Sequence, residues 1–112
     1  MVVQLDRRQG QCCNSALQWG GKDGNGCDMN RDHLKHGPLG RLWKEDVGTT
    51  HFAVSEWECE QKCKDTSEDL VACMFWNTKC WLYTRQEFGN TITGGNNKDF
   101  YTCWLRKGIS PI

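Results

Sequence analysis

The chain has 112 residues, including eight cysteines, and its 14 basic side chains balance its 14 acidic ones. A chain without net charge has no overall field to attract nucleic acid or an anionic membrane, and no apolar run here is long enough to span a bilayer. The length predicts one domain with a core of modest size.

The first residues are polar and charged, and they do not read as a signal peptide. We therefore expect any export signal to have been removed or to lie outside this sequence. Residues 1–11 are interpreted as a flexible N-terminal segment, 12–107 as a single domain and 108–112 as a tail.

Residues 20–40 are rich in Gly, Asn and Asp and predict a loop. Within it, Asp28, Asn30 and Asp32 match the first three liganding positions of an EF-hand calcium loop, but the required glycine and closing glutamate are replaced. A polar loop with Asx turns is the favoured interpretation, so we expect neither a metal nor a cofactor. An apolar strand is predicted to begin near Leu42.

The clearest local signal is a helix over 56–64. Ser55 is a good N-cap and Glu58 follows three residues later, which is the pattern of a capping box. Cys59 and Cys63 are four residues apart and share one helical face. The other face is charged.

Three strands are predicted after the helix from apolar, aromatic and β-branched runs. The first two, Leu70–Trp76 and Cys80–Thr84, form a hairpin around a turn at 77–79. The third is Phe100–Leu105, and the stretch 89–98 before it is interpreted as a loop or the end of a hairpin.

Alternation along the hairpin sorts its side chains onto two faces. If the helix cysteines form disulfides with the hairpin, then the face beneath the helix carries Val71, Cys73, Phe75, Cys80 and Leu82. The face away from the helix carries Ala72 and the candidate binding side chains Met74, Trp76, Trp81 and Tyr83. Such rings suit sugar stacking or a protein partner. The alternative is a second small core covered by segment 20–45. Trp57, near the helix start, is expected to pack on neighbouring loops.

Basic side chains offer a second candidate site. Arg85 follows the second predicted strand and Arg106 follows the third, so the two could meet at one end and receive an acidic sugar or sulfate. The alternative is that both are ordinary solvated charges.

The cysteines favour disulfides over zinc. Their spacings form no repeated pair, and His33, His36 and His51 are scattered, so no tetrahedral ligand set is evident. Oxidised cysteines supply no thiolate, and we therefore expect no catalytic activity.

The cysteine-containing segments resemble those of the PAN/apple domain family. The resemblance rests on Cys59-Glu-Gln-Lys-Cys63, Cys73-Met-Phe-Trp, Cys80-Trp-Leu-Tyr and the late Cys103. It implies a disulfide-rich α+β fold, in which one helix packs on a twisted antiparallel sheet of about five strands. It also implies that Cys59 pairs with Cys80, that Cys63 pairs with Cys73, and that an early cysteine pairs with Cys103.

Three early cysteines compete for that last bridge. Adjacent cysteines seldom bridge each other, so we expect Cys27 to pair with Cys12 or Cys13 and the remaining one to reach Cys103. A direct bridge between Cys27 and Cys103 is the alternative.

The resemblance also implies a function. Such domains occur in secreted and cell-surface proteins, where they bind carbohydrate or protein, so we expect a non-catalytic extracellular adhesion module. Its partner would be a carbohydrate or an extracellular protein, with no nucleic acid and no membrane span. The alternatives are a structural or oligomerising domain of a larger secreted protein, a homodimer among them, and a small secreted inhibitor.

Overall fold

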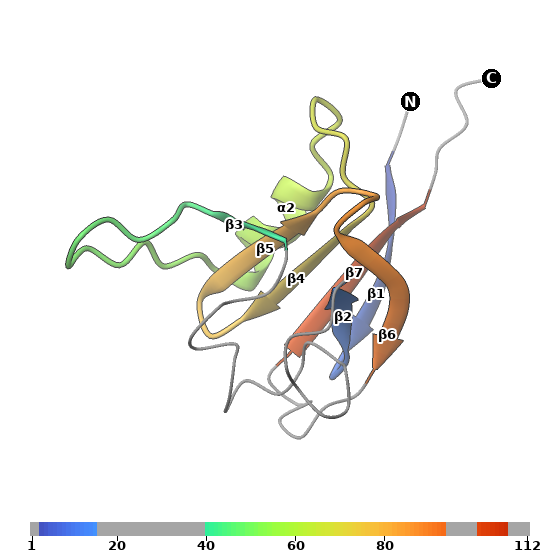
Figure 1. Cartoon of the computed structure of the whole chain (residues 1–112), viewed down its shortest axis with the longest axis horizontal. Coiled ribbons are helices and arrows are strands. Elements are labelled where there is room, and N and C mark those ends of the chain that lie inside the picture. The colour runs from blue at the N-terminus through green and yellow to red at the C-terminus, as the bar shows by residue number, and fades with distance from the viewer. Residues whose placement is uncertain (1–2, 16–39, 94–100, 108–112) are drawn as a thin grey trace.

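The computed structural model describes residues 3–15, 40–93 and 101–107 of the chain. Within these ranges one helix packs on a five-stranded antiparallel sheet of order β1-β7-β4-β5-β3, and β2 pairs with β6 in a small second sheet (Figure 1). The elements are β1 (Gln4–Gln9), β2 (Cys12–Ser15), β3 (Arg41–Trp43), α2 (Glu56–Cys63), β4 (Ala72–Trp76), β5 (Lys79–Tyr83), β6 (Phe88–Thr93) and β7 (Tyr101–Lys107). The predicted α+β class is confirmed.

The helix begins at the predicted capping box. The backbone N–H of Glu58 donates to Ser55 Oγ over 3.0 Å, and the backbone N–H of Ser55 donates to Glu58 Oε1 over 2.9 Å. Two amides at the helix start are thereby satisfied without any tertiary contact. The helix ends at Cys63, with Lys64 as the C-cap.

Strands β4 and β5 form the predicted hairpin, and its turn is tight. Trp76 pairs with Lys79, which leaves Asn77 and Thr78 as a two-residue loop. Both loop residues have positive φ, 48° and 61°, as expected for a type I′ turn. This turn matches the right-handed twist of the strands that it connects.

Two disulfides join the helix to this hairpin. Cys59 pairs with Cys80 and Cys63 pairs with Cys73, with Cα–Cα separations of 5.6 and 6.0 Å. These are the pairings that the PAN/apple resemblance implied. Each closes a short loop and is worth about 2–4 kcal/mol to a small domain.

The structure shows part of the disulfide pairing of the early cysteines. Cys13 pairs with Cys103 at a Cα–Cα distance of 5.3 Å, so the bridge to the last cysteine comes from Cys13 rather than from Cys12. Cys12 is also disulfide-bonded. The predicted role of Cys27 lies outside the described residues.

Two segments that we expected to be irregular are strands. Segment 1–11, expected to be flexible, contains β1, which pairs along its whole length with β7 from Gln4↔Lys107 to Gln9↔Thr102. Segment 89–98, expected to be a loop or the end of a hairpin, begins within β6, which pairs with β2; residues 94–98 lie outside the described ranges. Both strands are polar or contain poor strand formers, and their partners are distant in sequence, so local pattern gave no signal.

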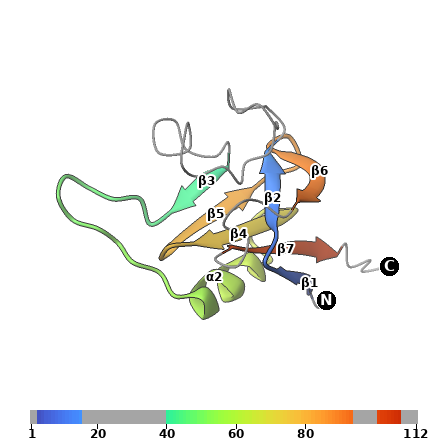
Figure 2. The ribbon, with the colours of Figure 1, turned by 90° about the horizontal axis from the view of Figure 1, so that it is seen from below.

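The large sheet separates two apolar clusters, with α2 on one side and the small sheet on the other (Figure 2). The helix-side cluster contains Cys73, Cys80, Leu82 and Trp104 together with the helix cysteines. The predicted alternation is thus confirmed from Cys73 onward. Val71 is the exception, because it precedes β4 and packs with the opposite cluster.

Between β3 and α2 the chain forms an arm, residues 44–54, which extends beyond the edge of the sheet (Figure 1). An antiparallel bridge between Val47 and Thr50 closes its tip. Of the helices that the structure describes, none has the length and apolarity that crossing a membrane requires.

Candidate functional site

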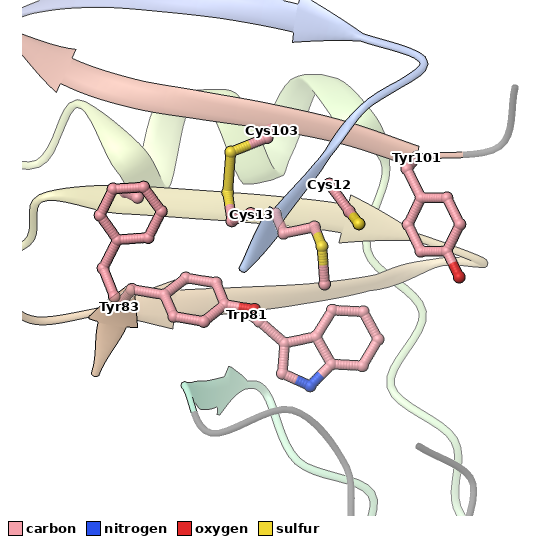
Figure 3. Packing of buried hydrophobic residues seen from close by; sticks show 9 residues of the cluster. Cys12, Cys13, Trp81, Tyr83, Tyr101 and Cys103 are labelled. Atoms are coloured by element: carbon pink, nitrogen blue, oxygen red, sulfur yellow. A yellow bond between two sulfur atoms is a disulfide. The ribbon is translucent and has the colours of Figure 1, made fainter. Parts of the chain in front are cut away.

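The aromatic face that we considered as a candidate binding site is covered, as in the alternative of a second small core. Met74 and Tyr83 are 0% exposed and Trp81 is 5% exposed. They pack in one cluster with Cys12 of β2 and Phe88 of β6, as the buried side chains in Figure 3 illustrate. The small sheet therefore supplies the cover, and a ligand cannot reach these three side chains in this arrangement.

The other predicted site residues are dispersed. Trp76 is half-buried and stacks on Tyr101, with ring centroids 6.0 Å apart. Arg85 is exposed on the turn after β5. Arg106 is half-buried, and its Nη1 donates to the carbonyl oxygens of Glu68 (2.8 Å) and Leu70 (3.0 Å), which gives it a structural role in holding the segment before β4.

A groove lies on the opposite side of the molecule, along the outer face of α2. Its volume is about 560 Å³. The lining side chains come from β3, from the helix and from the segment just after it: Trp43, Trp57, Glu58, Gln61, Lys62, Lys64 and Asp65. We call this feature the Trp57 groove.

Helical geometry explains why an indole is exposed there. Cys59 and Cys63 fix the inner face of the helix by their disulfides. Trp57 lies two residues before Cys59, which is about 200° around the helix and so places it on the outer face. It is 67% exposed, the largest exposed fraction among the large apolar side chains of the described residues. Gln61 follows four residues later and continues the same stripe.

Trp43 forms the second aromatic wall of the groove. It is half-buried at the edge strand β3 and packs against the helix-side cluster. Two ammonium groups approach its ring, Lys44 Nζ at 4.9 Å and Lys62 Nζ at 5.8 Å from the centroid. Cation–π attraction therefore holds both lysines against the indole.

Every ammonium group at the Trp57 groove has a carboxylate partner. Lys44 Nζ lies 4.0 Å from Glu58, and Lys64 Nζ lies 3.9 Å from Glu60. Lys62 bridges two carboxylates, Asp65 at 3.3 Å and Glu68 more closely. The groove therefore presents matched charges rather than a patch of one sign.

The pKa directions agree with this pairing. The hydrogen bond to Glu68 raises the pKa of Lys62, and the same bond lowers the pKa of Glu68. Hydrogen bonds from the Ser67 hydroxyl and backbone N–H, and then from Lys62, lower the pKa of Asp65 to about 2. The Ser55 backbone N–H is the main cause of a lowered pKa at Glu58. All four groups are ionised at neutral pH.

A second polar cluster fastens the arm to the β4–β5 turn. His51 Nε2 lies 2.9 Å from Thr78 Oγ1, and His51 Nδ1 lies 3.0 Å from Asp46 Oδ1. Lys79 Nζ donates to Asp46 Oδ2 over 2.9 Å, and the Phe52 N–H donates to Asp46 Oδ1 over 3.0 Å. These bonds, that from Lys79 above all, hold the pKa of Asp46 well below its usual range.

The order hydroxyl, imidazole, carboxylate in this cluster resembles the arrangement that activates a nucleophile. Here, however, Asp46 is shared between His51 and Lys79, and Lys79 Nζ also lies 3.2 Å from His51 Nδ1. None of these residues lines the Trp57 groove. The cluster is best described as a clamp that sets the position of the arm.

No group of three or more His, Cys, Asp or Glu side chains able to hold a metal ion occurs within 3–15, 40–93 and 101–107. The cysteines in those ranges are all disulfide-bonded. The candidate calcium ligands Asp28, Asn30 and Asp32 lie outside the described residues.

Comparison with protein-family models, with curated proteins and with solved structures finds no match to this chain. Its functional interpretation therefore rests on its own residues.

Sequence reasoning assigned Trp57 to packing and so missed the groove. The signal was present, because the spacing between Trp57 and Cys59 already sets the indole opposite the disulfide face. The contribution of Trp43 was not predictable in this way, since it depends on β3 pairing with β5 beside the helix.

Proposed function

We propose that this chain is a non-catalytic, extracellular recognition module of the PAN/apple type, and that it binds carbohydrate in the Trp57 groove. Two features support the scaffold assignment. The helix and hairpin cysteines pair as that family's pattern implies, and Cys13 ties the N-terminal region to Cys103. Disulfides form and persist mainly in oxidising compartments, which supports an extracellular location.

The observation that carries the binding proposal is the exposed indole of Trp57. A large apolar ring that is 67% exposed loses hydrophobic stabilisation unless a ligand covers it. The groove has a volume of about 560 Å³ and is open to solvent rather than enclosed, so a sugar ring could reach the indole directly. One flat ring flanked by polar side chains suits a sugar, which has an apolar C–H face and hydroxyl groups around its rim.

The test is a glycan array followed by calorimetric titration of the best ligand. Trp57→Ala should weaken binding at least about tenfold, because the stacking surface is lost. Phe52→Ala is the matched control: Phe52 is an exposed aromatic residue on the arm, outside the groove lining, and its removal should leave affinity unchanged.

Two results would contradict the proposal. One is the absence of binding to any glycan. The other is self-association of the chain that Trp57→Ala abolishes, because this would assign the indole to a protein interface. Sedimentation velocity of the wild-type protein and of Trp57→Ala over a concentration series tests for the second outcome.

A further inference from the structure

We infer that the Trp57 groove selects an electrically neutral pyranoside, with one sugar ring on the Trp57 indole, and discriminates against sulfated and uronic saccharides. The inference rests on the proposed function and names the ligand class of the same site. It differs in both place and charge from the sequence-based hypothesis of an acidic sugar at Arg85 and Arg106, which do not line this groove.

The charges that line the groove cancel. Glu58 and Asp65 contribute two negative groups, and Lys62 and Lys64 contribute two positive ones. An anionic sugar would bring a third negative charge close to two carboxylates. Like charges at such distances repel, and the groove has no surplus cation to offset the repulsion.

The lysines at the groove are already committed to carboxylates. Lys62 lies between Asp65 and Glu68, with a side chain only 18% exposed, and it also approaches the Trp43 ring. A sulfate that reached the remaining N–H of Lys62 would lie beside Asp65 and Glu68, whose charges repel it. The same holds at Lys44 and Lys64, each of which has a carboxylate at about hydrogen-bonding range or just beyond, Glu58 at 4.0 Å and Glu60 at 3.9 Å. Anion binding is thus opposed by the existing ion pairs.

Neutral hydroxyl groups face no such conflict. An ammonium group has three N–H donors, and a carboxylate has about four lone-pair positions, so each ion pair keeps capacity for further hydrogen bonds. Sugar hydroxyls both donate and accept, and therefore can bind an ammonium and its partner carboxylate together. Gln61, on the same stripe as Trp57, adds an amide with both functions.

The experiment uses an array in which each neutral oligosaccharide is printed beside its sulfated counterpart, with dextran and dextran sulfate as the soluble pair. Binding of the wild-type protein should be at least about tenfold stronger for the neutral member. It should also change little between roughly 0.05 and 0.5 M NaCl, since no ion pair forms with the ligand.

A double variant, Glu58→Gln with Asp65→Asn, sharpens the test. Glutamine at position 58 retains the carbonyl oxygen that the capping box needs, so the helix start is preserved. The groove then carries a net positive charge and should gain affinity for the sulfated member, in a manner that salt suppresses.

Stronger binding of sulfated glycans by the wild-type protein, weakened by salt, would overturn the neutral class while leaving a saccharide site at Trp57 intact. Equal binding of both members would also overturn it. If neither member of any pair binds, the proposed function fails and this inference fails with it.

Discussion

Trp81 and Trp57 lie on opposite sides of the five-stranded sheet, and their exposed fractions are 5% and 67%. Trp81 projects from β5 towards β2 and β6, which cover it with a second layer. Trp57 projects outward from α2, and the two disulfides keep the helix from turning that face inward. The same residue type is therefore packed between two sheets on one side and exposed to solvent on the other.

The largest effect on the free energy of unfolding should come from a substitution in the buried cluster between the two sheets. Trp81→Ala removes a ring packed between the two sheets and should lower the free energy of unfolding by about 3–5 kcal/mol. Trp57→Ala should change it by no more than about 0.5 kcal/mol, as expected for a surface position. Urea denaturation with intact disulfides measures both. Equal losses would show that the indole of Trp57 also supports the fold.

An intermediate effect is expected at the helix start. Ser55→Ala removes the side-chain half of the capping box and should cost about 1 kcal/mol. The loss of the cap should destabilise the first turn of α2, the helix that carries most of the side chains lining the Trp57 groove, and leave the rest of the domain unchanged. Hydrogen exchange should therefore accelerate at the first turn of α2 and not in β4 or β5. Uniform acceleration throughout the domain would contradict a local role.

The smallest effect is the dependence of the free energy of unfolding on pH. It arises from charged groups on the helix side of the sheet, at and next to the Trp57 groove. The lowered pKa values of Asp65, Glu58 and Glu68 mean that these carboxylates stabilise the fold above their unfolded-state pKa values, near 4. That contribution is lost as the pH falls through the pKa values of the folded state. For Asp65 the folded-state pKa is about 2. Stability measured by urea titration should therefore decline from about pH 5 towards pH 2.

Asp65→Asn supplies the control for this pH dependence. The variant lacks one of the titrating groups, so its stability should decline less steeply over the same interval. An identical slope in both proteins would assign the acid sensitivity to other carboxylates, such as Asp46 in the clamp on the arm.

The parts of the fold that were predictable are those specified within a few residues. Ser55 and Glu58 define the helix start by their spacing, and the hairpin follows from two apolar runs around a short turn. Strand β1 has Leu5 as its only apolar residue, and only its pairing with β7 makes it a strand. The covering of Trp81 depends likewise on β2 and β6, which are far apart in the sequence and pair only in the folded structure.

The candidate site follows the same division. The outward position of Trp57 was contained in its distance from Cys59, whereas the ion pairs of Lys62 with Glu68 and of Lys44 with Glu58 require the folded arrangement of separate segments. Period-two alternation correctly gave the face of Trp81, but it carries no information about what lies above that face.

The Cys13–Cys103 bridge, with a sequence separation of 90, also determines how the domain would respond to mechanical tension. Because β1 and β7 are antiparallel, with Gln4 opposite Lys107, pulling the two flanking segments apart would unzip that strand pair one residue at a time. Unzipping would stop at the disulfide, since the load then passes through a covalent bond from Cys13 to Cys103. The chain from Cys13 to Cys103, which contains the helix, the hairpin and the Trp57 groove, would therefore not be extended while the bridge is intact, and β4 would continue to hold β7 at Trp104 and Leu105.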